Sequence, residues 1–156
     1  MIDLETRYLV EDLYARYASC LNNERLDEWP EFFVDDCQYV VIPRENFEHE
    51  WPLATMSLES KGMLKDRIYG IKQTLFFAPY YQRHMISALS ARSVGDDIEA
   101  EANYLVIRTK RNELSEIYNC GRYMDRIVRT PEGLKFAVKR CIFDSEMIPN
   151  SLIYPL

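Results

Sequence analysis

Residue types that commonly carry out catalysis or bind metals are sparse in this chain. Only two histidines occur, His49 and His84, and the expected secondary structure places no pair of them on one element. A non-haem iron or zinc site normally uses two or more histidines together with a carboxylate. We therefore expect that no metal ion binds to this chain.

The cysteines and glycines exclude further kinds of site. Cys20, Cys37, Cys120 and Cys141 are scattered with no close pair, which argues against a disulfide framework and against a zinc or iron–sulfur knuckle. We expect them to be buried, reduced thiols. The five glycines form no dinucleotide-binding or phosphate-binding loop, and no G-x-S-x-G motif is present. The sequence thus predicts no cofactor in this chain.

One set of side chains could still perform acid/base chemistry. If helices cover a strongly curved sheet, the two together form a cone, and a cone can enclose a site for a small apolar substrate. Four side chains could line such a cavity: His84, Asp66, Tyr39 and Tyr104. We favour the alternative, in which His84 is a hydrogen-bonded structural group and Asp66 pairs with Arg67 or Arg83 where helix and sheet meet.

A run of four strands joined by short turns would form the sheet of this cone. Residues 98–109 alternate apolar and polar side chains, which is typical of a half-buried strand. Residues 115–128 are partly apolar on both faces, so we expect both faces of that strand to be covered. Strands this long must twist and curve. The four strands are expected at residues 84–94, 98–109, 115–128 and 134–144.

Helices are expected before this sheet. Asp3 can cap a helix in which apolar residues recur at helical spacing over residues 4–21. We expect a second, short helix that carries Pro30 near its beginning, because the missing N–H of proline matters least there. Asp35-Asp36 is expected to turn the chain into a further strand at residues 37–42, which would join the sheet.

The region between that strand and the long sheet is mixed. Residues 44–55 show no periodicity, so we expect an ordered loop on the surface, which could equally serve as a contact arm. Residues 57–75 have helical spacing of apolar residues, with Gly62 and Gly70 as expected breaks between turns or helices.

Length and charge limit the possible partners. One domain covering residues 1–156 is expected from the length. The net charge is −6 and no basic cluster is present, so we do not expect nucleic acid to bind. No apolar run approaches the roughly 20 residues that a membrane span requires. We expect a cytoplasmic protein.

Several short motifs stand out by their order and spacing along the whole chain. They are Trp29-Pro30-Glu31-Phe32-Phe33, Asp36-Cys37-Gln38-Tyr39, Pro43-Arg44-Glu45-Asn46-Phe47, Pro52-Leu53-Ala54-Thr55, Glu59-Ser60-Lys61-Gly62-Met63-Leu64 with Lys65-Asp66-Arg67-Ile68, Tyr81-Gln82-Arg83-His84 and Phe143-Asp144-Ser145-Glu146-Met147-Ile148. Together they resemble the small (beta) subunits of Rieske-type aromatic-ring-hydroxylating oxygenases. Within that family, the four motifs that begin at Pro43, Pro52, Glu59 and Phe143 are most similar to salicylate hydroxylase small subunits, followed by anthranilate- and terephthalate-type relatives.

This resemblance implies a fold and a division of labour between subunits. The fold would be an α+β cone of the nuclear-transport-factor-2-like class, with a mainly antiparallel sheet wrapped around the N-terminal helices. In that family the large (alpha) subunit carries the Rieske [2Fe–2S] cluster, the mononuclear Fe(II) and the substrate pocket. The small subunit is mainly structural, so no catalytic residue is carried over to this chain.

The resemblance also implies partners. Small subunits assemble with large subunits and with one another, commonly as an α3β3 hexamer, so this chain would stabilise the catalytic trimer. The complex would hydroxylate salicylate or a similar aromatic carboxylate, with electrons from NAD(P)H passed through a reductase and a ferredoxin. The residues leave one function of another class open, a stand-alone dehydratase or isomerase that uses an acid/base pocket inside the cone.

The final residues, 147–156, are largely apolar but contain Pro149 and Pro155, so they can neither extend the last strand nor form a helix. Four of their side chains would contribute roughly 1.5–3 kcal/mol each if fully buried, before ordering costs: Ile148, Leu152, Ile153 and Leu156. We expect this tail to dock at a subunit interface. The alternative is that it folds back over its own sheet and closes the cone.

Overall fold

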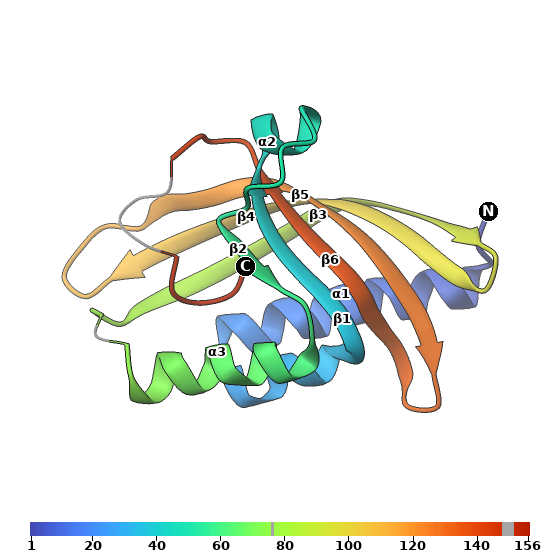
Figure 1. The fold of residues 1–156 in the computed structure, drawn as a ribbon, viewed down its shortest axis with the longest axis horizontal. Helices are drawn as coiled ribbons and strands as arrows, with labels where there is room; N and C mark the ends of the chain where they lie inside the picture. The colour runs from blue at the N-terminus through green and yellow to red at the C-terminus, as the bar shows by residue number, and fades with distance from the viewer. Residues whose placement is uncertain (76, 148–151) are drawn as a thin grey trace.

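The computed structural model describes residues 1–75, 77–147 and 152–156, and in this part of the chain one six-stranded sheet is the central feature (Figure 1). The strands lie in the order β2-β1-β6-β5-β4-β3. Strands β1 and β6 pair in parallel, and the other neighbours pair antiparallel. Their bounds are β1 Phe33–Pro43, β2 Met56–Leu58, β3 Tyr80–Val94, β4 Asp97–Lys110, β5 Glu116–Thr130 and β6 Gly133–Phe143.

The predicted meander of four long strands is confirmed as β3 to β6. Most strand ends differ from the prediction by one or two residues, but β3 begins at Tyr80 rather than at His84. The earlier start follows from pairing, because Tyr80 lies opposite Lys110 at the end of β4. The strand therefore extends for as long as its partner can supply hydrogen bonds.

Bulges bend this sheet. The register of β3 with β4 shifts between Ser87 and Ser90, and Ala88 between them has a φ of 54°. Register shifts also interrupt the β4–β5, β5–β6 and β1–β6 ladders. A bulge bends its strand and increases the local twist, so the sheet curls over the helices.

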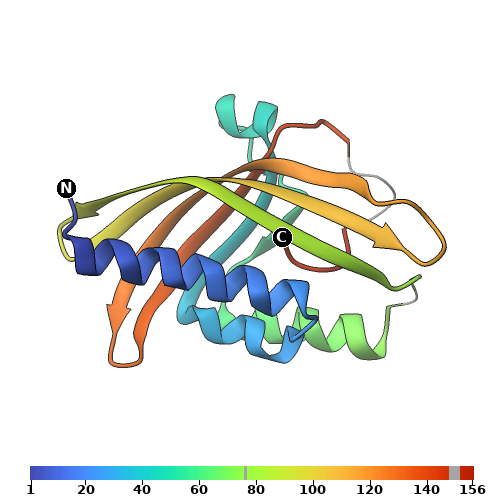
Figure 2. The ribbon, with the colours of Figure 1, turned by 180° about the vertical axis from the view of Figure 1, so that it is seen from behind.

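Three helical segments lie along the same face of the sheet (Figures 1 and 2): α1 (Leu4–Asn22), the 3-10 helix η1 (Leu26–Phe32) and α3 (Lys61–Gln73). The predicted cap of α1 is confirmed, since Asp3 Oδ1 accepts a hydrogen bond of 2.6 Å from the Thr6 backbone N–H. Ser60 caps α3 in the same way. The curved sheet wrapped around N-terminal helices is the expected α+β cone. No helix among the described residues is long and apolar enough to cross a membrane.

Four local predictions are wrong. Asp35-Asp36 forms no turn but lies exposed within β1, where pairing with β6 is irregular and tolerates both carboxylates. Residues 44–55 begin with a short helix, α2 (Arg44–Glu48). Residues 57–75 begin in strand β2, which pairs with β1. Gly62 and Gly70 lie inside α3, because glycine within a helix costs only about 1 kcal/mol and packing on the sheet can offset this.

The prediction that β5 is covered on both faces is also wrong. The helices α1, η1 and α3 lie against only one face of the sheet (Figure 2). On the other face, Met124 is half-buried because it lies in register between Glu101 of β4 and Arg140 of β6. Long side chains of neighbouring strands therefore provide the shielding that we had expected from a second layer. At one end of this face the ring centroid of Phe47 of α2 lies 5.8 Å from the guanidinium carbon of Arg122. We call this face, which no helix of the layer α1, η1 and α3 covers, the outer face.

The tail folds into the cone. Leu152, Ile153, Tyr154 and Leu156 are all at least nine-tenths buried within their own chain. Arg67 of α3 holds the segment in place, because its Nη2 donates to the carbonyl oxygens of Leu152 at 2.7 Å and Ile153 at 2.9 Å. For residues 152–156 the expected interface docking is therefore wrong and the fold-back alternative is right. The prediction for Ile148 concerns a residue outside the described part of the chain.

Candidate functional site

The interior of the cone contains an ion pair that joins two neighbouring strands. Lys139 of β6 lies opposite Asp125 of β5, its Nζ is 2.8 Å from Asp125 Oδ2, and both side chains are fully buried. The hydroxyl of Tyr14 on α1 donates a hydrogen bond to the same oxygen, and the Arg140 backbone N–H donates to Oδ1 at 3.3 Å. This carboxylate therefore ties α1 to the sheet.

An aromatic cage surrounds the ammonium group of Lys139. Its Nζ lies 3.5 Å from the ring centroid of Tyr123, with the rings of Phe136, Tyr17 and Tyr14 at 4.3, 4.6 and 4.9 Å. Attraction between a cation and aromatic faces, together with the carboxylate, replaces the water that a buried charge loses. The charge of Lys139 is thus balanced entirely by protein groups.

Burial changes the acidity of this cluster. It raises the pKa of the Asp125 carboxyl above its usual value, although the charge of Lys139 and the hydrogen bonds from Lys139 and Tyr14 act in the opposite direction. Burial, and then the nearby Asp125, raise the pKa of Tyr14 well above that of a free phenol. Tyr14 therefore stays protonated and acts as a hydrogen-bond donor.

His84 lies buried inside the cone, where it is hydrogen-bonded to α1. Its Nδ1 is 3.0 Å from Asn22 Oδ1, and its backbone N–H donates to the same oxygen at 2.7 Å, which fixes the end of α1 against β3. Because Asn22 Oδ1 is an acceptor, Nδ1 carries the proton. Burial, and then the charge of Lys139, lower the pKa of His84 to about 3. The imidazole is therefore neutral at physiological pH and a very weak base.

Two other predicted site residues, Tyr104 and Tyr39, are buried and are hydrogen-bonded to other groups of the chain. Tyr104 donates to Asn119 Oδ1 at 2.6 Å and its ring stacks on Tyr123 at 4.5 Å. Tyr39 is fully buried, and its hydroxyl accepts a hydrogen bond of 2.8 Å from the Leu156 backbone N–H.

Asp66 is excluded from the interior altogether. It is exposed on α3, because Leu64, Ile68 and Ile71 form the buried side of that helix. The expected ion pair with Arg67 or Arg83 is absent among the described residues.

The end of the tail lies in the interior of the cone, where Leu156 is fully buried. The Leu156 carbonyl oxygen accepts hydrogen bonds from the hydroxyls of Tyr17 at 2.7 Å and Tyr39 at 3.2 Å. Trp29 Nε1 donates to the Tyr17 hydroxyl at 3.1 Å. Phenols that could have held a ligand are thus engaged with the chain itself.

Sequence reasoning missed the buried pair, although a signal was present. Asp125 is two residues from both Tyr123 and Ile127, so it lies on the same face of its strand as these apolar residues. Lys139 is likewise two residues from both Ala137 and Cys141, so it lies on the same face of its strand as these two residues. A charged residue at an inward position of two adjacent strands predicts a buried pair.

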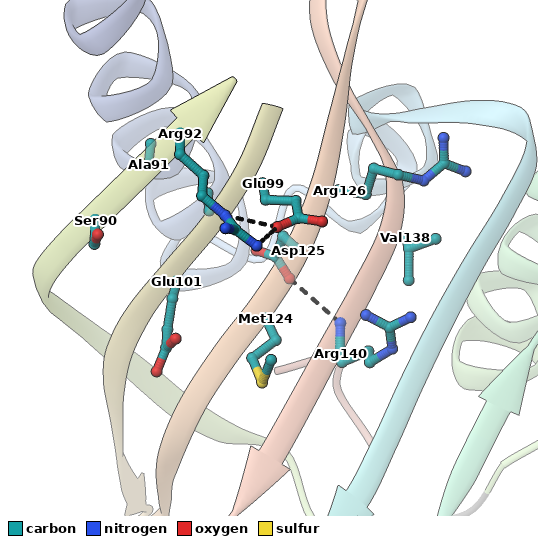
Figure 3. Close-up of a pocket in the computed structure, with 11 residues that line it drawn as sticks. Ser90, Ala91, Arg92, Glu99, Glu101, Met124, Asp125, Arg126, Val138 and Arg140 are labelled. Carbon is teal, nitrogen blue, oxygen red and sulfur yellow. Dashed lines mark hydrogen bonds and ion pairs between the residues drawn. The ribbon is translucent and has the colours of Figure 1, made fainter. Parts of the chain in front are cut away.

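A groove lies on the outer face of the sheet. It has a volume of about 510 Å³ and extends over β3, β4, β5 and β6 (Figure 3). Arg92 and Glu99 form an ion pair of 2.5 Å at one end, and Glu101, Met124 and Arg140 line the rest (Figure 3). This mixture of charges with apolar side chains suits a protein surface better than a small apolar molecule.

The sequence is similar to subunits of ring-hydroxylating enzymes. The family model described as the ring hydroxylating beta subunit matches residues 16–150. The chain is 35% identical over 155 residues to the anthranilate 1,2-dioxygenase small subunit of Burkholderia cepacia. The alignment covers 99% of this chain and 96% of that relative. It is 26% identical to a beta subunit of the terephthalate 1,2-dioxygenase terminal oxygenase component of a Comamonas species, over 91% of this chain and 93% of the relative.

Solved structures of similar fold agree with this. A chain from Novosphingobium aromaticivorans, assigned as the beta subunit of an aromatic-ring-hydroxylating dioxygenase, superposes with a TM-score of 0.88 at 36% identity, covering 97% of both chains. A chain of naphthalene 1,2-dioxygenase superposes with a TM-score of 0.82 over 100% of this chain and 88% of its own length. At 16% identity, the latter match supports the fold alone.

Proposed function

The chain belongs to the family of ring-hydroxylating beta subunits, and we propose that it serves in its oxygenase as a structural, non-catalytic subunit. Its partner is the large subunit of the same oxygenase. We further propose that the two assemble as an α3β3 hexamer in which this chain stabilises the trimer of large subunits.

One observation carries this proposal: the chain fills its own cone. Tyr17 and Tyr39 are engaged with Leu156, and the pKa of His84 is lowered to about 3. A general acid or base works best with a pKa near the working pH. These facts weigh against a stand-alone dehydratase or isomerase that uses His84, Asp66, Tyr39 and Tyr104.

The residues of this chain do not fit the metal groups of the oxygenase. A Rieske cluster takes two cysteines and two histidines, and a mononuclear iron site takes two histidines and a carboxylate. Here His49 is exposed after α2 and stacks on Trp51, whereas His84 is buried on β3. No three candidate ligands gather among the described residues. We therefore assign the [2Fe–2S] cluster and the Fe(II) to the large subunit.

We propose an aromatic carboxylate as the substrate of the complex. Anthranilate and terephthalate, which name the relatives, both carry a carboxylate on an aromatic ring, and the motifs of this chain resemble those of salicylate hydroxylases. The electrons would come from NAD(P)H through a reductase and a ferredoxin. Because the substrate would bind to the large subunit, this chain would affect turnover through assembly.

Co-expression with the large subunit of the same oxygenase tests this function. We expect one complex of both subunits on size-exclusion chromatography with light scattering, with iron and ring-hydroxylating activity. Salicylate, anthranilate and terephthalate form the substrate panel, and each subunit is omitted in turn. Turnover of an aromatic substrate by the small subunit alone, or failure of the two chains to associate, would refute the proposal.

A further inference from the structure

The outer face of the sheet carries an apolar patch at one end. Met85 pairs in register with Leu105, and Ile107 pairs with Ile117, so side chains of three neighbouring strands lie next to one another. Tyr81, Met85 and Ile117 are 73%, 55% and 67% exposed. We call Tyr81, Met85, Leu105, Ile107 and Ile117 the outer apolar patch. Large apolar side chains gathered on an exposed face mark a protein interaction site.

The other end of the same face is charged. Three of its arginines are paired: Arg92 with Glu99, Arg122 with Glu101, and Arg126 with Asp97. Arg140 is half-buried in the groove of Figure 3, and its guanidinium forms no ion pair with any described residue. A partly desolvated guanidinium without a counter-ion favours a carboxylate from outside.

The charge of the outer face indicates what kind of protein surface would bind to it. Along β3 to β6 this face carries more arginines than carboxylates, whereas the whole chain has a net charge of −6. The arginines are Arg83, Arg92, Arg122, Arg126 and Arg140, and the carboxylates are Asp97, Glu99 and Glu101. A second copy that used the same face in a two-fold contact would bring like charges together. An acidic surface of a different chain is the complementary partner.

We propose that the large subunit docks on the outer face of this sheet. Its apolar side chains would cover the outer apolar patch, and at least one of its carboxylates would enter the groove and pair with Arg140. This inference rests on the proposed function, because it requires the large subunit as partner.

Charge insertion into the outer apolar patch provides the first test. Separately purified wild-type large subunit is titrated with wild-type small subunit and with the double variant Met85→Glu/Ile117→Glu, and association is followed by biolayer interferometry. We expect at least about tenfold weaker binding, since central apolar contacts carry much of the energy of an interface. The control is Tyr69→Glu, a residue that is 65% exposed on α3, away from the outer face. It should bind as the wild type does.

The groove is tested by reversing one charge. Arg140→Glu should weaken binding about tenfold or more. Arg140→Lys should bind more tightly than Arg140→Glu but less tightly than the wild type, because lysine keeps the positive charge but lacks the planar set of N–H donors of a guanidinium. Lys65→Glu makes the same change of charge at an exposed position of α3 and should have little effect. The melting temperature of each isolated variant shows that loss of binding is not loss of folding.

The outcomes separate the two proposals. If the wild-type chains do not associate, both the proposed function and this inference fail. If they associate but the variants of the outer face bind like the wild type, only this inference fails. It fails as well if these variants abolish self-association of the small subunit while leaving its binding to the large subunit intact, because the face would then bind a second copy.

Discussion

Lys139 Nζ lies 2.8 Å from Asp125 Oδ2 in the fully buried interior of the cone, directly across the β5–β6 ladder. Removing one member of such a pair leaves an uncompensated charge, which typically costs about 3–5 kcal/mol. We expect Lys139→Met to lower the free energy of unfolding of the isolated chain by this amount in urea denaturation. Adding Asp125→Asn should recover part of the loss, because the unpaired carboxylate is then gone.

The exposed pair between Arg126 and Asp97 provides the control for that experiment. It joins β5 to β4, on the neighbouring hairpin, with a distance of 2.8 Å, and both of its side chains are partly exposed to solvent. Surface ion pairs contribute about 0–1 kcal/mol. Arg126→Met should therefore change stability by no more than this. Equal effects of Lys139→Met and Arg126→Met would contradict the role given to the buried pair.

Gly121 allows the strands β5 and β6 to approach each other closely. A Cβ at this position would lie 1.9 Å from the carbonyl oxygen of Ile142, so the backbone itself would have to move. We expect Gly121→Ala to destabilise the chain by about 2 kcal/mol or more, at the upper end of single substitutions, as measured by thermal unfolding. Gly62→Ala is the matched control, since its Cβ would meet only Ser60 Oγ at 3.6 Å. It should be neutral or stabilise α3 by up to about 1 kcal/mol.

His84 should make stability depend on pH in a defined window. Its folded-state pKa is lowered from 6.5 to about 3. Below pH 6.5 the unfolded state therefore binds a proton that the folded state does not, and stability falls as the pH decreases toward 3. The predicted loss is about 2 kcal/mol between pH 6 and pH 4.5.

His84→Asn isolates this effect, because asparagine can still donate to Asn22 but does not titrate. Carboxylates titrate in both proteins, so the difference between their stability curves reports on His84. Parallel curves from pH 7 to pH 4.5 would show that the imidazole is not held neutral. In the assembled oxygenase, the same variant should keep its turnover per iron, since His84 is assigned no part in the reaction.

Metal content provides a further prediction. The two histidines lie in different environments, one exposed and one buried, and the four cysteines are all free thiols. We expect the purified chain to contain less than stoichiometric iron and zinc after dialysis, as measured by elemental analysis. The complex with the large subunit should contain iron under the same conditions. A metal ion that remains bound to the small subunit alone in a one-to-one ratio would overturn the assignment.

The sequence predicted the meander well because alternation of apolar and polar residues is a local property of each strand. The same alternation could have placed Asp125 and Lys139 at inward positions of neighbouring strands. That the two lie directly opposite each other depends on the register across a hairpin that contains a bulge, which a local pattern does not determine. The helical spacing of Leu64, Ile68 and Ile71 could have placed Asp66 on the exposed side of α3. Apolarity likewise indicated that the tail is buried, but not which surface buries it.

The tail gives the last prediction, because its burial within its own cone changes what its removal should do. Burying Leu152, Ile153 and Leu156 contributes roughly 1.5–3 kcal/mol each, and an ordering cost of about 1–2 kcal/mol per residue offsets most of this. Deletion would also leave the buried donors of Tyr17, Tyr39 and Arg67 without their partners in the tail, at about 1–3 kcal/mol for each group. We therefore expect deletion of residues 152–156 to lower the melting temperature of the isolated chain by roughly 5–15 °C. Arg67→Met removes only the two hydrogen bonds to Leu152 and Ile153, so it should cause a smaller change in the same direction. If the shortened chain melted like the wild type but no longer bound the large subunit, the tail would act at an interface and not as the lid of the cone.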